Sequence, residues 1–141
     1  MELQEAFEKR RTVREFAGPA SDEQVERVLD AGSLAPSAGN KQAWFVVVVN
    51  DGRTKEKLGE IKRSYNASWT PDTGEGRAKL DAQQNAFKDC TTLLFYTFAP
   101  EADDPHVADA GSVWLLIENL CLAAVEENLG TQIVGDRKSV V

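Results

Sequence analysis

The run "WFVVVVN" at residues 44–50 constrains the fold of this chain more than any other stretch of its sequence. Its six consecutive apolar residues, four of them valines, are typical of a strand that is buried on both faces. A second run, "TTLLFYTFA" at 91–99, predicts another buried strand. Because such strands need helices on both sides of their sheet, the two runs predict a three-layer α/β or α+β domain.

Helical patterns fill most of the chain around these runs. Four shorter helices are expected, at residues 2–10, 22–32, 52–63 and 77–88. Ser21 and Gln24 form a capping-box pattern before the second helix, and Asp51 is placed to cap the third. The segment at 64–76 is rich in Gly, Pro, Ser, Thr and Asn, which predicts an irregular and mobile excursion.

A long helix is expected at about 107–128. It is apolar on almost every side, which predicts a central helix that other elements pack against all round. Gly130 is placed to end this helix as a left-handed cap, and "TQIVG" at 131–135 predicts a short third strand. A buried helix of this kind fits the layered domain that the two apolar runs require.

Length and charge limit the number of domains and the class of ligand. A chain of 141 residues is expected to form a single domain over 1–141, and 42% hydrophobic with 28% charged residues is typical of a soluble globular protein. The 23 acidic residues outnumber the 16 basic ones, which gives a formal charge of −7. General binding to nucleic acid draws on a broad basic face, so we do not expect it.

The sequence contains no export signal or membrane span. Its start, "MELQEAFEKRR", lacks an apolar centre, and the longest apolar segment, at 113–125, is shorter than the roughly 20 residues that cross a bilayer. Cys90 and Cys121 lack a metal-like spacing and are interpreted as buried free thiols in a reducing compartment. The sequence predicts a cytoplasmic protein without a metal, in which His106, the single histidine, is a loop residue.

The cluster "RRTVREF" at 10–16 concentrates positive charge in an acidic chain. Arg10, Arg11 and Arg14 offer planar donor groups suited to phosphate, and Thr12 adds a hydroxyl between them. Alternatively, the basic residues at the end of the first helix complement its dipole, and spacing alone favours this interpretation. Arg14 lies beyond the helix, and in an extended segment Arg10, Thr12 and Arg14 point in one direction.

Two further stretches are candidates for contact with a ligand. "APSAGNKQAW" at 35–44 is a loop of small residues, whose backbone can approach a flat ligand, and Asn40 and Gln42 supply donors and acceptors. On its own it is equally well interpreted as an ordinary polar loop. "NLGTQIVG" at 128–135 carries two glycines, which are often no more than helix caps.

Together, in this order and at these distances, the three stretches resemble the FMN-dependent nitroreductase family. The family pattern has an arginine pair, a Ser or Thr, a further basic residue and Phe, then an Ala-Pro-Ser…Asn-x-Gln-Pro-Trp loop, then a helix ending in Asn-x-x-x-Ala-Ala…Gly-Leu-Gly. The chain departs from it at Ala43, where the family has proline. It also stops before the C-terminal segment usual in the family, so the resemblance implies a dimeric, nitroreductase-like α+β sandwich without that segment.

The resemblance implies one set of residues around FMN at a dimer interface. Arg10 and Arg11 would bind the phosphate, Thr12 would meet the ribityl chain, and Arg14 would approach the pyrimidine side of the ring system. The other implied contacts are Pro36, Ser37, Ala38 and Asn40 from the partner subunit, with Val134 and Gly135 over the rings.

The implied activity is NAD(P)H-driven two-electron reduction of nitroaromatic or quinone-like acceptors, by ping-pong hydride transfer through flavin N5. Because reduced flavin gathers negative charge at N1 and O2, a nearby cation favours hydride uptake, and no catalytic side chain is expected. One alternative is a flavin-binding relative without reductase turnover. Another is a specialised family reaction such as flavin fragmentation or reductive dehalogenation, for which the sequence carries no distinct signature.

Overall fold

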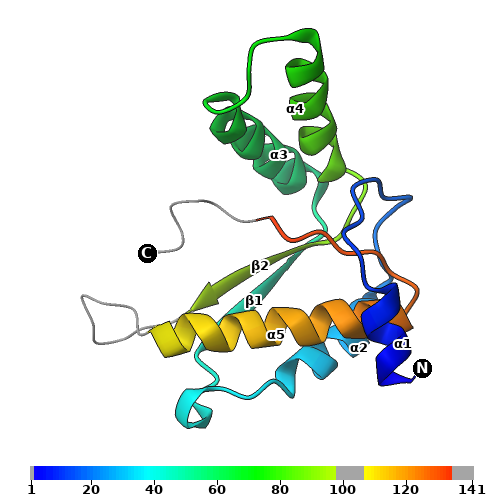
Figure 1. The fold of residues 1–141 in the computed structure, drawn as a ribbon, viewed down its shortest axis with the longest axis vertical. Helices are drawn as coiled ribbons and strands as arrows, with labels where there is room; N and C mark the ends of the chain where they lie inside the picture. The colour runs from blue at the N-terminus through cyan, green and yellow to red at the C-terminus, as the bar shows by residue number, and fades with distance from the viewer. Residues whose placement is uncertain (1, 98–106, 135–141) are drawn as a thin grey trace.

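The computed structural model describes residues 2–97 and 107–134 of the chain (Figure 1). Its elements are, in order, α1 (Leu3–Lys9), α2 (Asp22–Ser33), a 3-10 turn η1 (Ala38–Asn40), β1 (Trp44–Val49), α3 (Gly52–Ala67), α4 (Gly74–Ala86), β2 (Thr92–Thr97) and α5 (Val107–Glu126). The expected helices and the first two strands are therefore present. The two predicted N-terminal caps are confirmed as well, because Ser21 and Gln24 form a capping box on α2 and Asp51 caps α3.

The two strands form an antiparallel pair, with α5 lying across one face of it (Figure 1). Trp44 lies opposite Thr97 at one end of the pair and Val49 opposite Thr92 at the other. The core lies between this face and the apolar sides of α2 and α5. Its buried members are Val28, Ala35, Leu116, Leu120 and Ala124.

The other face of the sheet corrects the expectation that the strands are buried on both sides. Side chains of a strand alternate between faces, and in β1 the outer positions Phe45 and Val47 are 61% and 46% exposed. Val49, the one buried residue of β1, lies on this same face, at the end of the strand that leads to α3. Over Phe45 and Val47, by contrast, the described residues supply little cover, and the expected third layer is not seen there.

Helix α5 is also less enclosed than its composition predicts. Leu116, Leu120 and Ala124 are buried against α2 and the sheet, but Trp114 is 51% and Leu115 49% exposed. The expectation that other elements pack all round this helix is therefore wrong for the single chain. About half of the surface of these two side chains has no cover among the described residues.

Helices α3 and α4 form a hairpin that stands beyond the end of the sheet (Figure 1). The irregular excursion expected at 64–76 is limited to 68–73, because α3 extends to Ala67 and α4 begins at Gly74. Contacts between the two helices explain the difference. Arg63 Nη2 lies 2.7 Å from an oxygen of Asp81, and Asn66 donates to Gln83 at 2.7 Å, so tertiary packing overrides weak helix propensity.

The chain after α5 differs from its prediction in two ways. The left-handed residue that ends the helix is Asn128 (φ 58°), not Gly130. Its amide donates to Val125 and the next amide to Ala124, which is the Schellman pattern. The predicted third strand at 131–135 is reduced to one parallel bridge between Thr131 and Thr12, and Gly135 lies outside the described residues.

Both cysteines are free thiols. Cys121 is buried as expected, whereas Cys90 is only half-buried. No group of three or more His, Cys, Asp or Glu side chains in the described ranges is arranged to hold a metal ion, and His106 falls outside those ranges. None of the described helices has the length and apolar character needed to span a membrane.

We expect Gly59→Ala to lower the free energy of unfolding by about 1 kcal/mol. A Cβ at Gly59 would lie 2.7 Å from the backbone oxygen of Gln84 in α4, and overpacking costs about 1–3 kcal/mol, offset by the roughly 1 kcal/mol that alanine gains over glycine in a helix. Gly52→Ala in the same helix is the control, since its Cβ would meet nothing within 4 Å. Urea denaturation measures both, and equal shifts would contradict the close approach at Gly59.

Candidate functional site

The arginine segment leaves α1 as extended chain and is fixed beside the end of α5. Arg10 is the C-terminal cap of α1, with φ −61° and ψ 121°. Thr12 forms the parallel bridge with Thr131, and the amide of Val13 donates to the Thr131 carbonyl at 2.9 Å. The extended conformation on which the sequence interpretation depended is therefore present.

Gly130 permits this close approach. A Cβ at this position would lie 2.5 Å from Cγ2 of Val13, a distance that real side chains do not adopt. Gly130 is therefore required for contact with the neighbouring segment rather than for a left-handed cap. The sequence pattern indicated a special role for Gly130, but it predicted a left-handed cap, whereas the structure requires glycine there for close approach to Val13.

A cavity of about 240 Å³ lies between the two paired segments. Its lining residues come from the end of α1, the arginine segment and the end of α5: Lys9, Arg11, Val13, Val125, Asn128, Leu129, Gly130 and Thr131. The alternate positions Arg10, Thr12 and Arg14 are not among them, as expected for an extended segment.

Arg10 lies on the side of the segment that approaches Cys121. Burial raises the pKa of the Cys121 thiol, while the Thr131 hydroxyl and the charge of Arg10 oppose that rise. The net direction is upward, so this thiol stays protonated at neutral pH. Cys121 is accordingly a packing residue and not a nucleophile.

The guanidinium groups of Arg10, Arg11 and Arg14 form no ion pair with any carboxylate in the described part of the chain. By contrast, each arginine of a second set binds a carboxylate: Arg27, Arg63 and Arg77. Free cationic donors on an extended backbone, next to a cavity, fit the phosphate of a nucleotide-like ligand. The residues present therefore fit the anionic end of FMN.

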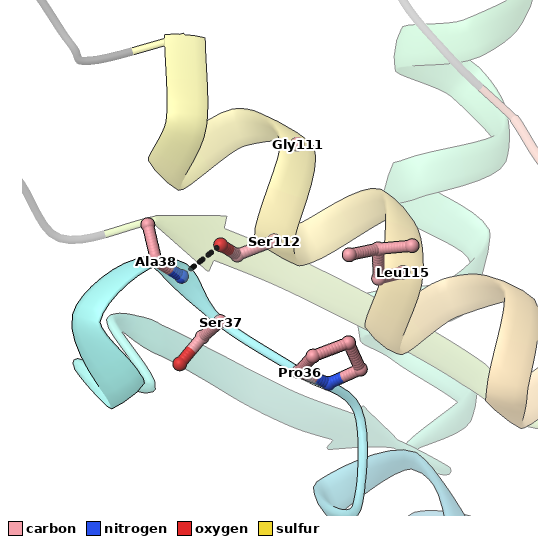
Figure 2. Close-up of a pocket in the computed structure, with 6 residues that line it drawn as sticks. All are labelled: Pro36, Ser37, Ala38, Gly111, Ser112 and Leu115. Carbon is pink, nitrogen blue, oxygen red and sulfur yellow. Dashed lines mark hydrogen bonds between the residues drawn. The ribbon is translucent and has the colours of Figure 1, made fainter.

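The second part of the site is the loop before β1 together with the first half of α5 (Figure 2). Here a cavity of about 420 Å³ is lined by Pro36, Ser37, Ala38, Gly111, Ser112 and Leu115. The Ala38 amide donates to the buried Ser112 hydroxyl at 3.1 Å, and Lys41 Nζ lies 3.7 Å from the buried Asp109 carboxylate. These two contacts fix the loop to α5, and small apolar side chains form the wall.

The backbone of this loop is unusual. Gly39, Asn40 and Gln42 all have positive φ, at 59°, 53° and 48°. Glycine adopts this conformation freely and asparagine tolerates it, but glutamine rarely does. The amide of Gln42 donates to the Ser37 hydroxyl at 2.9 Å, which holds the strained residue in place. Such strain is typical of a segment shaped for a ligand.

The two parts of the site lie toward opposite ends of α5. The loop cavity includes Leu115 and the arginine cavity includes Val125, and ten helical residues span about 15 Å. One chain therefore does not bring Pro36, Ser37 and Ala38 next to Arg11. Asn40 is exposed in the loop, Val134 is 46% exposed after the bridge at Thr131, and the predicted contact at Gly135 lies outside the described residues.

The sequence patterns did not indicate several residues that line the two cavities: Gly111, Ser112, Leu115 and Val125. Ser112 carried a usable signal, because it is a small polar residue directly before the apolar run at 113–117 of the helix. Asn128 belongs to the candidate stretch at 128–135, but no local pattern indicated that it, rather than Gly130, takes the left-handed conformation that ends α5.

Comparison with known sequences supports the resemblance. The family model described as Nitroreductase family matches residues 7–140. The chain is 44% identical over 52 residues to an Archaeoglobus fulgidus protein provisionally named NADH dehydrogenase/NAD(P)H nitroreductase, a match covering 36% of this chain and 30% of that relative. It is 47% identical over 51 residues to 5,6-dimethylbenzimidazole synthase of Rhodospirillum rubrum, a match covering 36% of this chain and 24% of that relative. The matched stretches thus span less than a third of these curated relatives.

Solved structures resemble nearly the whole chain. Oxidized iodotyrosine deiodinase bound to FMN and 3-iodo-L-tyrosine is 25% identical with a TM-score of 0.78, covering 96% of this chain and 76% of that one. An FMN-dependent nitroreductase of Clostridium difficile R20291 is 23% identical with a TM-score of 0.75, covering 95% and 60%. With the family match over residues 7–140, these findings mean that the chain belongs to the nitroreductase family.

Proposed function

We propose that residues 1–141 form an FMN-binding domain of a cytoplasmic oxidoreductase that uses NAD(P)H to reduce nitroaromatic or quinone-like acceptors by two electrons. The observation that carries the proposal is the arginine segment, free of carboxylate partners in the described ranges and fixed beside α5 by the bridge between Thr12 and Thr131. The similar iodotyrosine deiodinase structure holds FMN. When bound, FMN supplies hydride transfer between the nicotinamide and the acceptor.

The residues of this chain bind and orient that cofactor. Arg10 and Arg11 bind the phosphate, and Thr12 meets the ribityl chain. Arg14 places a cation near the pyrimidine edge, where negative charge gathers on reduction. Val134 would contact the ring system, and the contact predicted for Gly135 falls outside the described residues.

We propose that the site is completed by a second copy of the chain. A two-fold axis that packs α5 antiparallel against its copy would place the loop cavity of one subunit beside the arginine cavity of the other. Exposed apolar side chains on α1 and α5 support this packing: Leu3, Phe7, Trp114 and Leu115. The loop residues Pro36, Ser37, Ala38 and Asn40 then reach the flavin from the other subunit.

We expect Arg10→Ala and Arg11→Ala each to abolish retention of FMN through purification, because each removes a charged donor to the phosphate. Arg53→Ala makes the same change in net charge on the exposed first turn of α3 and is expected to retain the flavin. The flavin absorbance of the purified proteins measures occupancy. Full occupancy in either arginine variant would count against this assignment.

We expect Trp114→Asp to give a monomer that no longer binds FMN, although it keeps every proposed cofactor residue. A charge at this exposed position of α5 opposes burial in the proposed interface. Ile61→Asp, at a 56% exposed position on α3, is the matched control. Size-exclusion chromatography with absorbance detection reports assembly and flavin together, and a flavin-loaded monomer would disprove the two-subunit site.

Measuring enzymatic turnover distinguishes the proposed reductase from a protein that only binds flavin. The FMN-loaded protein is expected to oxidise NADH or NADPH when menadione or a nitrobenzene is supplied. Loss of nicotinamide absorbance measures the rate, and protein freed of FMN is the control. Stable FMN binding with no oxidation of either nicotinamide would favour the alternative, a flavin-binding relative without reductase activity.

A further inference from the structure

One residue at the end of α5, Glu127, receives three hydrogen bonds from α2. Arg27 donates from Nε and Nη2 to the two carboxylate oxygens, at 2.7 Å and 2.6 Å, and Gln24 Nε2 donates to the backbone oxygen at 3.0 Å. The Glu127 side chain is 19% exposed. Hydrogen bonds from Arg27 lower the pKa of this carboxyl, so it is ionised at neutral pH. Two-point pairing of this kind fixes orientation as well as distance.

The donors on α2 are themselves held in place. Gln24 uses its other side-chain atom, Oε1, to accept from the Ser21 amide at 3.0 Å, and its own amide donates to the Ser21 hydroxyl at 3.2 Å. Arg27 follows three residues later, so both side chains project from neighbouring positions on one helix face. The start of α2 is therefore a rigid support for the end of α5.

The residues that follow Glu127 in the sequence contact the arginine segment in space. Asn128 turns the chain with a left-handed conformation, and Leu129 packs against the core. Gly130 then lies against Val13, whose amide donates to Thr131. Because Thr131 follows Glu127 by only four residues, the position of Glu127 limits where the paired arginine segment can lie.

We propose that Arg27, Gln24 and Glu127 form a latch that positions Arg10 and Arg11 for the phosphate of the ligand. None of the three lines either cavity, so they are positioning residues and do not touch the cofactor. The proposal rests on the proposed function, since it takes FMN as the ligand. It adds residues of α2, which no motif of the sequence connected with the flavin.

The test compares FMN with riboflavin, which has the same ring system and ribityl chain but no phosphate. Arg27→Gln and Glu127→Gln are each expected to weaken FMN binding about two- to fivefold, the range that corresponds to loss of one partly exposed ion pair. Riboflavin binding is expected to stay unchanged. Arg63→Gln breaks a similar pair, with Asp81 in the α3–α4 hairpin, and serves as the control. Quenching of flavin fluorescence on titration gives each dissociation constant.

The direction in which each variant changes FMN affinity distinguishes positioning of the arginines from a general effect of charge. Removing a negative charge near the arginines would tighten FMN binding if only the electrostatic field mattered, whereas removing Arg27 would weaken it. The latch instead predicts weaker FMN binding in both variants. Opposite signs, equal losses for FMN and riboflavin, or unchanged affinity would each overturn the latch and leave the proposed function standing. A wild-type protein that binds neither flavin would overturn the proposed function itself.

Discussion

The backbone pairing of the arginine segment with the end of α5 is the contact on which the candidate site depends. Helix α1 has seven residues, and an isolated helix of that length is not stable in water. The segment that follows it is held by the bridge of Thr12 to Thr131 and by the close approach of Val13 to Gly130. The backbone that carries three cationic side chains is thereby held in place, although repulsion between their charges opposes bringing them together.

Helix α5 determines how much of the site a single chain can supply. It carries the loop cavity along its first half and leads into the arginine cavity at its end. Its inward side chains complete the core, while Trp114 and Leu115 face outward with about half of their surface exposed. The same helix therefore separates the two parts of the site in one chain and offers the apolar surface through which two chains could join them.

The elements that could be predicted from the sequence are those fixed by local interactions. The capping box at Ser21, the cap at Asp51 and the order of helices and strands depend on neighbouring residues. The errors concern features that distant contacts decide. Gly130 was interpreted as a cap because no local pattern reveals Val13 beside it. The outer face of β1 was expected to be buried because an unbroken apolar run carries no information about which layer covers it.

The helix-dipole interpretation fits Lys9, which precedes the basic cluster, and Arg10, which is the C-terminal cap of α1. Lys9 lies in the last turn of α1, where it pairs with Glu5 and complements the helix end. Arg11 and Arg14 lie beyond the helix, and neither forms an ion pair with a described carboxylate, whereas Arg27 pairs with Glu127. Arg11 and Arg14 thus stabilise neither the helix nor an ion pair among the described residues, which supports the proposal that they bind an anion from outside the chain.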